Sequence, residues 1–567
     1  MKLFRLIMLL MLCNQIVAQS HWEQNTSPSY GELMDTLKKW HRENPELELY
    51  QMGSSDAGVP IYLCIVNGAK DSILTFEKAR KQTTVLINNA IHPGEPDGVN
   101  AMLLWIENWI KNGKHTQDLP VLAFIPAYNV DGMLNRNSSS RVNQNGPEEY
   151  GFRGTVRNYD LNRDFVKMDT KNAFVFASIY HSLDPDVFID NHVSNGADYQ
   201  YTLTYITALK ERMSPYLQEL TYSKMLPMLT KNLARRKWEL FPYVDLIGET
   251  PEEGITAFND LARYSNGYAA LFHSISFTVE THMLKPFPQR VKATQAFMEE
   301  TIKWVVLNQK AIEEARKKSF EWQNNQAYFK FNYERTQKAE SISFKGFKAT
   351  YPTSDVTGLP RLKYDELQPY QKNIPYFRNH QAADSVLIPD FYVLGNQESA
   401  VIDRLKANHI QFSTLTSDSS MKVTITKVVS FEASEKPYEG HFKMGEIKTN
   451  LTSETIQLRK GDLLIPVHQR GMNFLLQIFS SQAEDSYVSW NFFDSYLQQK
   501  EHFSSYIFID EAQQILNANP ALKKEFEDKK RNEKFRSSEW EQLNFIYERS
   551  KFHEPSERRL PVYQIFN

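Results

Sequence analysis

Two separate segments of the chain carry residues that could bind the same metal ion. His92 and Glu95 belong to the sequence HPGE, and an imidazole and a carboxylate at this spacing can turn toward one cation. In a chain with 14 histidines, about one such pair is expected by chance. His192 follows the apolar segment 186–191 and could complete a set of two histidines and one carboxylate. This set suits zinc and leaves a fourth position for water.

Glu280 is a candidate for the proton transfers that a hydrolytic zinc site needs. It ends the otherwise apolar segment 275–280 (ISFTVE), where a carboxylate would be costly to bury without a partner. A water molecule whose pKa zinc brings to about 7 is such a partner. Glu280 could accept a proton from this water and later deliver it to a leaving amine. If the two histidines are ignored, a salt-bridged surface glutamate explains the same residue.

A third group of residues could bind a substrate. Asn162 and Arg163 lie in the sequence RNYDLNRDF and place a planar amide beside a planar guanidinium. Together these groups can hold a terminal carboxylate through paired hydrogen bonds. A structural arginine that pairs with Asp160 or Asp164 is the alternative interpretation.

Predicted strands and helices alternate in a way that would position these residues. From about residue 30 to residue 310, short apolar runs alternate with longer amphipathic ones, which is typical of an α/β sheet. A helix is expected at 97–111, and strands are expected at 83–90, 121–125, 186–190 and 274–279. Open α/β sheets bind ligands at the carboxyl ends of their strands. We therefore expect the zinc ligands and Glu280 to meet at one edge of the sheet.

The character of the sequence changes near residue 320. Beyond this point the chain consists of short β-prone segments separated by Pro, Gly, Asp and Ser. We expect a catalytic domain at 20–319 and a β-rich accessory domain at 320–567 that ends in a charged helical segment at 517–549. The aromatic residues at 485–494 are expected to pack the core of this second domain, although exposed aromatics could bind glycan.

The first residues predict export. Two basic residues precede the apolar run 6–13, and small or polar residues follow around Ala18 and Gln19. This order is typical of a secretory signal peptide at 1–19, cleaved near Ala18 or Gln19. The apolar run is too short to cross a hydrocarbon core, which needs about 20 residues. We therefore expect a periplasmic or extracellular protein with no stable membrane span in the mature chain.

The charge balance argues against nucleic acid as a partner. The chain contains 65 Lys and Arg and 68 Asp and Glu, which gives a formal net charge of −3. Without an excess of positive charge, no long-range field attracts phosphates. No motif indicates an oligomeric state.

Five short motifs occur in the same order as in a known enzyme family. They are HPGE at 92–95, NVDG at 129–132, YDLNRDF at 159–165, NH at 191–192 and SFTVE at 276–280. In this order the motifs resemble the zinc carboxypeptidase family, whose prototype is carboxypeptidase A, over roughly residues 30–310. The resemblance implies an α/β fold with a mixed, mostly parallel sheet of about eight strands flanked by helices.

The resemblance also implies a role for each candidate residue. One catalytic zinc would be held by His92, Glu95 and His192. The pair Asn162 and Arg163 would bind the substrate carboxylate. Glu280 would act as the general base and then as the general acid.

Two further roles in this family have more than one candidate here. An arginine that polarises the scissile carbonyl could be Arg136, Arg141, Arg153 or Arg157, of which Arg141 is slightly favoured. A tyrosine that closes over the substrate is best matched by Tyr264, and Tyr268 is nearly as good. A packing role is equally compatible with either tyrosine.

Three functions remain in competition at this point. The leading hypothesis is an exported zinc metallocarboxypeptidase that acts on peptides with a free C-terminus. The second hypothesis keeps the zinc site and changes the substrate to cell-wall peptides or N-acyl amino acids, because Arg163 suits any small carboxylate. The third is an inactive surface protein that binds peptide or glycan, and Glu280 argues against it because a binding protein needs no proton shuttle.

Overall fold

The computed structural model describes residues 21–67, 72–112 and 119–566, so the predicted signal peptide at 1–19 lies outside the described residues. The largest sheet has eight strands in the order β1-β2-β4-β3-β5-β10-β6-β7. In chain order the strands are β1 (Leu47–Ser54), β2 (Pro60–Val66), β3 (Thr84–Asn88), β4 (Val121–Ile125), β5 (Val187–Ser194), β6 (Leu203–Thr207), β7 (Leu240–Pro242) and β10 (Ile275–His282). The central strands β4, β3, β5 and β10 run parallel, with antiparallel neighbours on both sides. The predicted mixed, mostly parallel sheet is confirmed.

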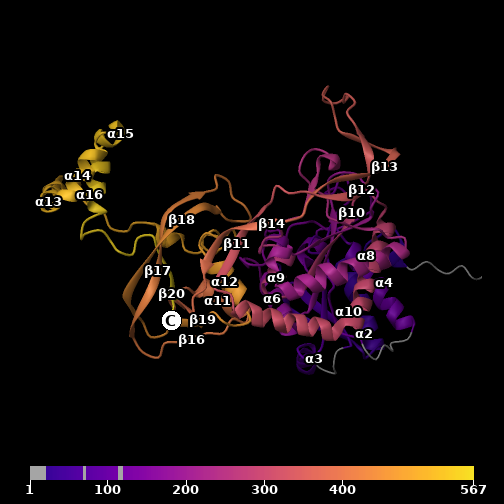
Figure 1. Ribbon diagram of the computed structural model, residues 1–567. Helices are drawn as coiled ribbons and strands as arrows, with labels where there is room; N and C mark the ends of the chain where they lie inside the picture. Colours follow the sequence, from indigo (N-terminus) through magenta and orange to yellow (C-terminus); the bar gives the residue numbers. More distant parts are fainter. Residues whose placement is uncertain (1–20, 68–71, 113–118, 567) are drawn as a thin grey trace, which may run out of the picture.

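Helices cover both faces of this sheet (Figure 1). The longer ones are α2 (Tyr30–Glu43), α3 (Ser72–Ala79), α4 (Asp97–Lys111), α6 (Lys171–Leu183), α8 (Leu226–Arg235), α9 (Ser265–Leu271) and α10 (Phe287–Asn324). On one face, Asn191 of β5 lies against Met298 of α10. On the other face, the ring of Phe188 contacts that of Phe176 in α6. Strands covered on both faces have no solvent-facing side, which explains why β3, β4 and β5 are buried along their whole length.

Strands β5 and β10 extend farther than the sequence predicts. The expected strands end at residues 190 and 279, whereas β5 runs to Ser194 and β10 to His282. The two strands pair in parallel along their full length, so backbone hydrogen bonding continues beyond the apolar residues. His192 and Glu280 therefore lie within strands rather than after them, and they are direct register partners.

A buried ion pair anchors the loop that contains Asn145 and Gly146 to helices α4 and α10. The guanidinium of Arg290 in α10 lies 2.8 Å from the carboxylate of Asp97 in α4, and both side chains are fully buried. Arg290 also donates to the carbonyl oxygens of Asn145 (2.8 Å) and Gly146 (2.9 Å). Because a buried charge is tolerated only when its donors are satisfied, this arrangement fixes the loop against α4 and α10.

The chain beyond α10 forms β structure, as predicted. Six strands form one sheet in the order β16-β19-β15-β20-β17-β18, and β11 pairs with β14. A four-stranded sheet, β12-β13-β9-β8, combines both parts of the chain. The bounds are β8 (Asp245–Leu246), β9 (Ile255–Thr256), β11 (Tyr328–Arg335), β12 (Glu340–Thr350), β13 (Lys363–Phe377), β14 (His380–Leu387), β15 (Phe391–Leu394), β16 (Ser413–Thr414), β17 (Ser419–Ala433), β18 (Met444–Leu458), β19 (Leu463–Pro466) and β20 (Arg559–Ile565).

The two parts of the chain are joined by shared structure. Strand β13 of the second part pairs with β9 of the first. The rings of Phe272 and Phe474 stack across the junction with centroids 5.8 Å apart. Helix α10 continues to Asn324, across the predicted boundary between residues 319 and 320. The boundary itself stays a prediction.

A separate helical lobe is inserted before the last strand. Its helices are α13 (Ser505–Ala518), α14 (Pro520–Lys529), α15 (Glu533–Arg536) and α16 (Glu539–Tyr547). They pack around their own cluster of apolar side chains and project to one side of the molecule (Figure 1). The chain then returns as β20, between β15 and β17. The charged helical segment was expected to end the domain, but a strand follows it. The short sequence RLPVYQI did not lead us to predict this strand.

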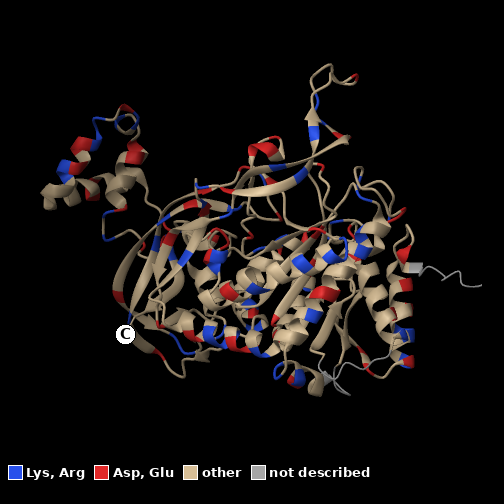
Figure 2. Cartoon of the chain, turned by 45° about the vertical axis from the view of Figure 1, so that its right-hand side comes forward, with Lys and Arg blue, Asp and Glu red and all other residues tan. Residues whose placement is uncertain are grey.

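The aromatic segment at 485–494 packs inside the second part. Tyr487 and Trp490 are fully buried. Along the chain, Lys and Arg are interspersed with Asp and Glu in helices, strands and loops (Figure 2). Among the described residues, no helix has both the length and the apolar character needed to cross a membrane.

Candidate metal centre and substrate cleft

Three side chains converge at the carboxyl edge of the central strands. His92 and Glu95 lie in the loop between β3 and α4, and His192 lies near the end of β5. Each offers one ligand atom, these atoms lie within 4.8 Å of one another, and all three residues are buried. The Nδ1 atom of His92 is 3.3 Å from Oε1 of Glu95, and Nδ1 of His192 is 3.2 Å from Oε2. Both imidazoles thus turn the same ring nitrogen toward one carboxylate.

Two aspartates hold the opposite nitrogens of these rings. Nε2 of His92 lies 2.9 Å from Oδ1 of Asp160, and Nε2 of His192 lies 2.9 Å from Oδ2 of Asp190. Carboxylates in this position fix the orientation of a metal-binding imidazole and increase its basicity. Sequence reasoning missed this role for both aspartates. The signal was present for Asp190, because residues two apart in a strand lie on the same face.

The donor set fits zinc. Among the described residues, Nδ1 of His92 is buried without a hydrogen-bond partner, as is Oε2 of Glu280. Burial alone would raise the pKa of Glu95, but Arg141, His92 and His192 hold this pKa well below its usual range. An ionised carboxylate with two imidazole nitrogens is a common three-residue zinc set with one open position.

Glu280 stands beside the metal-binding residues. The parallel register of β10 and β5 pairs it with His192. Burial raises the pKa of Glu280 to about 7, and the nearby carboxylates of Glu95 and Asp190 act in the same direction. A carboxyl group poised near neutral pH can both accept and return a proton.

Two of the four candidate arginines lie at the cleft. Arg141 donates from one terminal nitrogen to Glu95 (2.8 Å) and from Nε to Gln144 (2.6 Å). Arg153 donates from Nε to Asp160 at 2.9 Å, and its side chain is 44% exposed. Gly94 makes room for Arg141, because a Cβ atom at Gly94 would lie 2.5 Å from Cδ of Arg141.

The other two arginines point elsewhere. Arg136 donates to the carbonyl of Pro28 (3.1 Å), and Arg157 donates to that of Asp169 (2.9 Å). Neither lines the cleft. The geometry therefore leaves Arg141 and Arg153 as candidates for polarising a substrate carbonyl.

The predicted carboxylate-binding pair also lines the cleft. Asn162 and Arg163 lie in the 3-10 helix η2 (Leu161–Arg163). The guanidinium of Arg163 stacks over the ring of Tyr264 at 4.5 Å from its centroid. Tyr264 lines the cleft, whereas Tyr268 is buried and its hydroxyl donates to Asn408 at 2.6 Å. Of the two candidate tyrosines, only Tyr264 is placed where it could meet a substrate.

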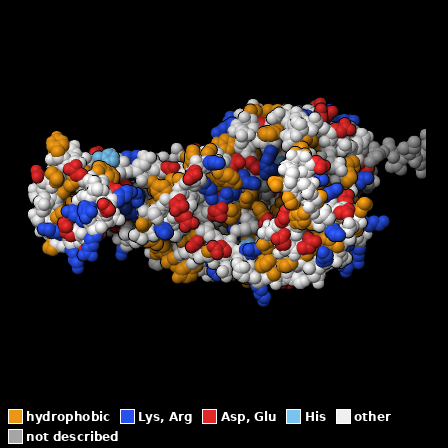
Figure 3. Space-filling view, turned by 90° about the horizontal axis from the view of Figure 1, so that it is seen from above, with side chains coloured by type: hydrophobic (Ala, Val, Ile, Leu, Met, Phe, Trp, Pro, Cys, Tyr) orange, Lys and Arg blue, Asp and Glu red, His pale blue; other side chains and the backbone are white. Residues whose placement is uncertain are grey.

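The cleft has a volume of about 440 Å³. Its wall also includes Tyr243, Phe258 and Asp260, which the sequence analysis did not single out. Asp260 is buried, and burial raises its pKa to about 7. Seen from above, Lys and Arg side chains lie beside a hollow near the middle of the molecule (Figure 3). The cleft therefore combines apolar rings with both acidic and basic groups.

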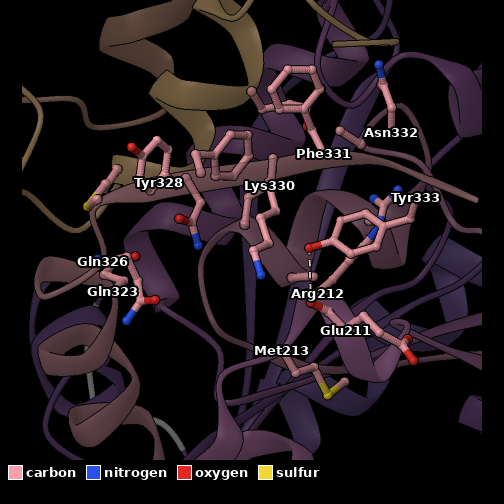
Figure 4. A pocket seen from close by; sticks show the side chains of 18 of the residues that line it. Glu211, Arg212, Met213, Gln323, Gln326, Tyr328, Lys330, Phe331, Asn332 and Tyr333 are labelled. Atoms are coloured by element: carbon pink, nitrogen blue, oxygen red, sulfur yellow. Dashed lines mark hydrogen bonds between the residues drawn. The ribbon is translucent and has the colours of Figure 1, made fainter. Parts of the chain in front are cut away.

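A second cavity of about 290 Å³ lies between β11 and the 3-10 helix η3 (Lys210–Arg212) (Figure 4). Lys330 points into it, and the hydroxyl of Tyr333 donates to the carbonyl of Glu211 at 3.0 Å. Arg212 donates to the backbone carbonyl of Asp260 at 3.1 Å. The two cavities thus share the segment that carries Asp260.

The fold and the site together define the class of this protein. The zinc carboxypeptidase family matches residues 33–339, and the chain belongs to this family. The predictions of a zinc metallopeptidase and of one zinc held by His92, Glu95 and His192 are confirmed. The roles of Glu280, Arg141, Tyr264, Asn162 and Arg163 stay predictions.

Solved structures of similar proteins include several carboxypeptidases. A metallo-carboxypeptidase from Burkholderia cenocepacia is 15% identical, with 48% of this chain and 68% of that chain covered and a TM-score of 0.36. Carboxypeptidase A from Helicoverpa armigera is 15% identical, with 54% and 77% covered and a TM-score of 0.37. A metallo-carboxypeptidase from Pseudomonas aeruginosa is 14% identical, with 50% and 68% covered and a TM-score of 0.35. No curated protein matches the sequence.

Proposed function

We propose that this protein is an exported metallocarboxypeptidase that removes the last residue from peptides with a free C-terminal carboxylate. One observation carries the proposal: the pair Asn162 and Arg163 lines the same cleft as Glu280 and the metal-binding residues. A carboxylate held by Arg163 would direct the adjacent peptide bond toward Glu280. A protein that only binds peptides would not need a half-buried glutamate poised near neutral pH.

In the proposed reaction, each of the cleft residues has a separate role. Zinc, when bound, supplies a Lewis acid that polarises the carbonyl group and favours ionisation of water. Arg163 and Asn162 bind the C-terminal carboxylate through charge-assisted hydrogen bonds. Arg141 and Arg153 can donate to the carbonyl oxygen as negative charge develops on it. Glu280 accepts a proton from the attacking water and delivers it to the leaving amine.

A peptide with an amidated C-terminus is expected to be a poor substrate. Replacing the carboxylate with an amide removes the charge that Arg163 recognises, so we expect kcat/KM to fall by about 10²-fold. Steady-state hydrolysis of matched free and amidated peptides measures this difference. In Arg163→Ala the two peptides should become nearly equal. Equal cleavage of both by the wild-type enzyme would contradict the proposal and favour an amidase or deacylase.

Export is supported by the sequence at 1–19 alone. When the full chain is expressed in a Gram-negative host, we expect protein outside the cytoplasm that begins at Gln19 or Ser20, because the apolar run precedes small residues suited to cleavage. N-terminal sequencing of the fractionated protein measures this. A chain with Leu9→Arg and Leu10→Arg should stay in the cytoplasm at its full length. Cytoplasmic wild-type protein that retains Met1 would disprove export.

A further inference from the structure

The substrate-binding loop is held in place by the second part of the chain. Among the described residues between α5 (Val130–Leu134) and α6, the short helix η2 is the only helix or strand. The second part contacts the loop that follows η2. The hydroxyl of Tyr487 donates to the carbonyl of Val166 at 3.3 Å, and Arg404 donates to that of Met168 at 2.9 Å. A loop with so little regular structure depends on such contacts for a defined conformation.

Asp160 is the point where this loop meets the metal centre. Its Oδ1 atom lies 2.9 Å from Nε2 of His92 and accepts a hydrogen bond from the backbone N–H of Asn162, also at 2.9 Å. Its Oδ2 atom accepts from Arg153 at 2.9 Å and lies 3.8 Å from Arg163. One carboxylate therefore contacts a zinc ligand and two arginines of the loop, Arg153 and Arg163. The orientation of all three side chains therefore depends on the position of the Asp160 backbone.

The hairpin tip between β17 and β18 reaches this backbone. The backbone N–H of Asp160 donates to Oε2 of Glu439 at 2.9 Å. Two residues further along the chain, Nε2 of His441 lies 2.7 Å from Oδ2 of Asp169. Gly440 packs against Tyr159, because a Cβ atom at Gly440 would lie 2.5 Å from the tyrosine hydroxyl.

The backbone of the tip is unusual for a glutamate. Tyr438 and His441 exchange backbone hydrogen bonds, and the two residues between them have positive φ angles, 49° for Glu439 and 82° for Gly440. Tight hairpin turns of this kind favour Asn, Asp or Gly, because a longer side chain is strained at positive φ. Strain of this kind persists where the surrounding structure uses the residue. Here the strained residue is the one whose carboxylate reaches Asp160.

We propose that Glu439 is a positioning residue that fixes the backbone of Asp160 and thereby sets the orientation of His92 and of the Asn162 and Arg163 pair. The inference rests on the proposed carboxypeptidase function for its effect on substrate binding. Its effect on the zinc site does not depend on which substrate is cleaved. The second part of the chain then completes an active site whose reacting residues all come from the first part.

The variant Glu439→Asn distinguishes a positioning role of Glu439 from a role in folding. Asn suits positive φ, so the turn is preserved, but its shorter side chain does not reach the N–H of Asp160. We expect KM for a peptide with a free C-terminus to rise about tenfold with kcat changed less than about twofold. We also expect the zinc dissociation constant, measured by competition with a chelator, to rise about three- to tenfold. The melting temperature should be equal to or above that of the wild type.

Two matched variants complete the experiment. Glu439→Gln keeps an acceptor oxygen at the same reach and should restore both KM and zinc affinity to near the wild-type values. Glu435→Gln changes an exposed residue of the same connection and should behave like the wild type. Unchanged KM and zinc affinity in Glu439→Asn would overturn the inference, as would an equal effect of Glu435→Gln. A wild-type enzyme that cleaves no peptide would refute the proposed function, and the zinc measurement would still decide the role of Glu439.

Discussion

Glu280→Gln is expected to lower kcat by about 10³-fold while the protein still binds one zinc. The substitution keeps the size and hydrogen bonding of the side chain but removes its ability to accept a proton. Glu280 is not one of the three metal-binding residues. The ligand atoms of His92, Glu95 and His192 lie within 4.8 Å of one another and form the metal site without a contribution from Glu280. Steady-state kinetics and elemental analysis of the purified variant measure the two properties separately. A variant that cleaves peptides at the wild-type rate would show that another group moves the proton.

The pH profile provides an independent check on Glu280. Burial raises its pKa from an ordinary 4.5 to about 7, and a bound cation would lower it from there. The ionised form is the base, so kcat/KM should fall as the pH decreases through this pKa. We expect the acidic limb of the wild-type profile to lie between these two values. The residual activity of Glu280→Gln should lack this limb, and a limb retained in the variant would assign the ionisation to a different group.

His192→Ala is expected to abolish both stoichiometric zinc binding and peptide hydrolysis. Two donors would remain, and they are too few to hold zinc tightly at an open site. The change also leaves the buried carboxylate of Asp190 without the imidazole that lies 2.9 Å away. An unpaired buried charge is destabilising, so the melting temperature should fall as well. Metal content, activity and thermal unfolding of the purified variant measure these three effects.

A matched control distinguishes this site from other histidines. His468 is exposed and lies outside the metal site, so His468→Ala should retain zinc, activity and stability. Treating the wild type with a chelator should reproduce the loss of activity, and added zinc should restore it in the wild type but not in His192→Ala. One tightly bound zinc per chain in His192→Ala would contradict the assignment of this ligand.

Much of the fold and of the site could be predicted because the signals are local. The apolar runs of β3 and β4 are buried on both sides, so their sequences differ visibly from those of the amphipathic helices between strands. The spacing of His92 and Glu95 in one loop is likewise a local property. Strand ends were harder to predict, since β5 and β10 continue through polar residues by pairing with each other.

The remaining parts of the site depend on contacts between distant segments. Four arginines were candidates in the sequence, with Arg141 slightly favoured, and only the course of the loop brings Arg141 and Arg153 to the cleft. Tyr264 and Tyr268 stand one helical turn apart, and packing against Asn408 places Tyr268 in the core. Nothing in the sequence near Asp160 indicates that Glu439, 279 positions away, accepts a hydrogen bond from its backbone.

By itself, the sequence determined which chemical groups are available: two imidazoles and a carboxylate for the metal, a glutamate that could transfer a proton, and an amide and a guanidinium that could bind a terminal carboxylate. The tertiary structure decided how they act together, because the register of β5 and β10 sets Glu280 beside His192. It also decided that the second part of the chain supports the site. The physical reason is that spacing and periodicity report neighbours within a segment, whereas register and packing depend on the shape of the whole chain.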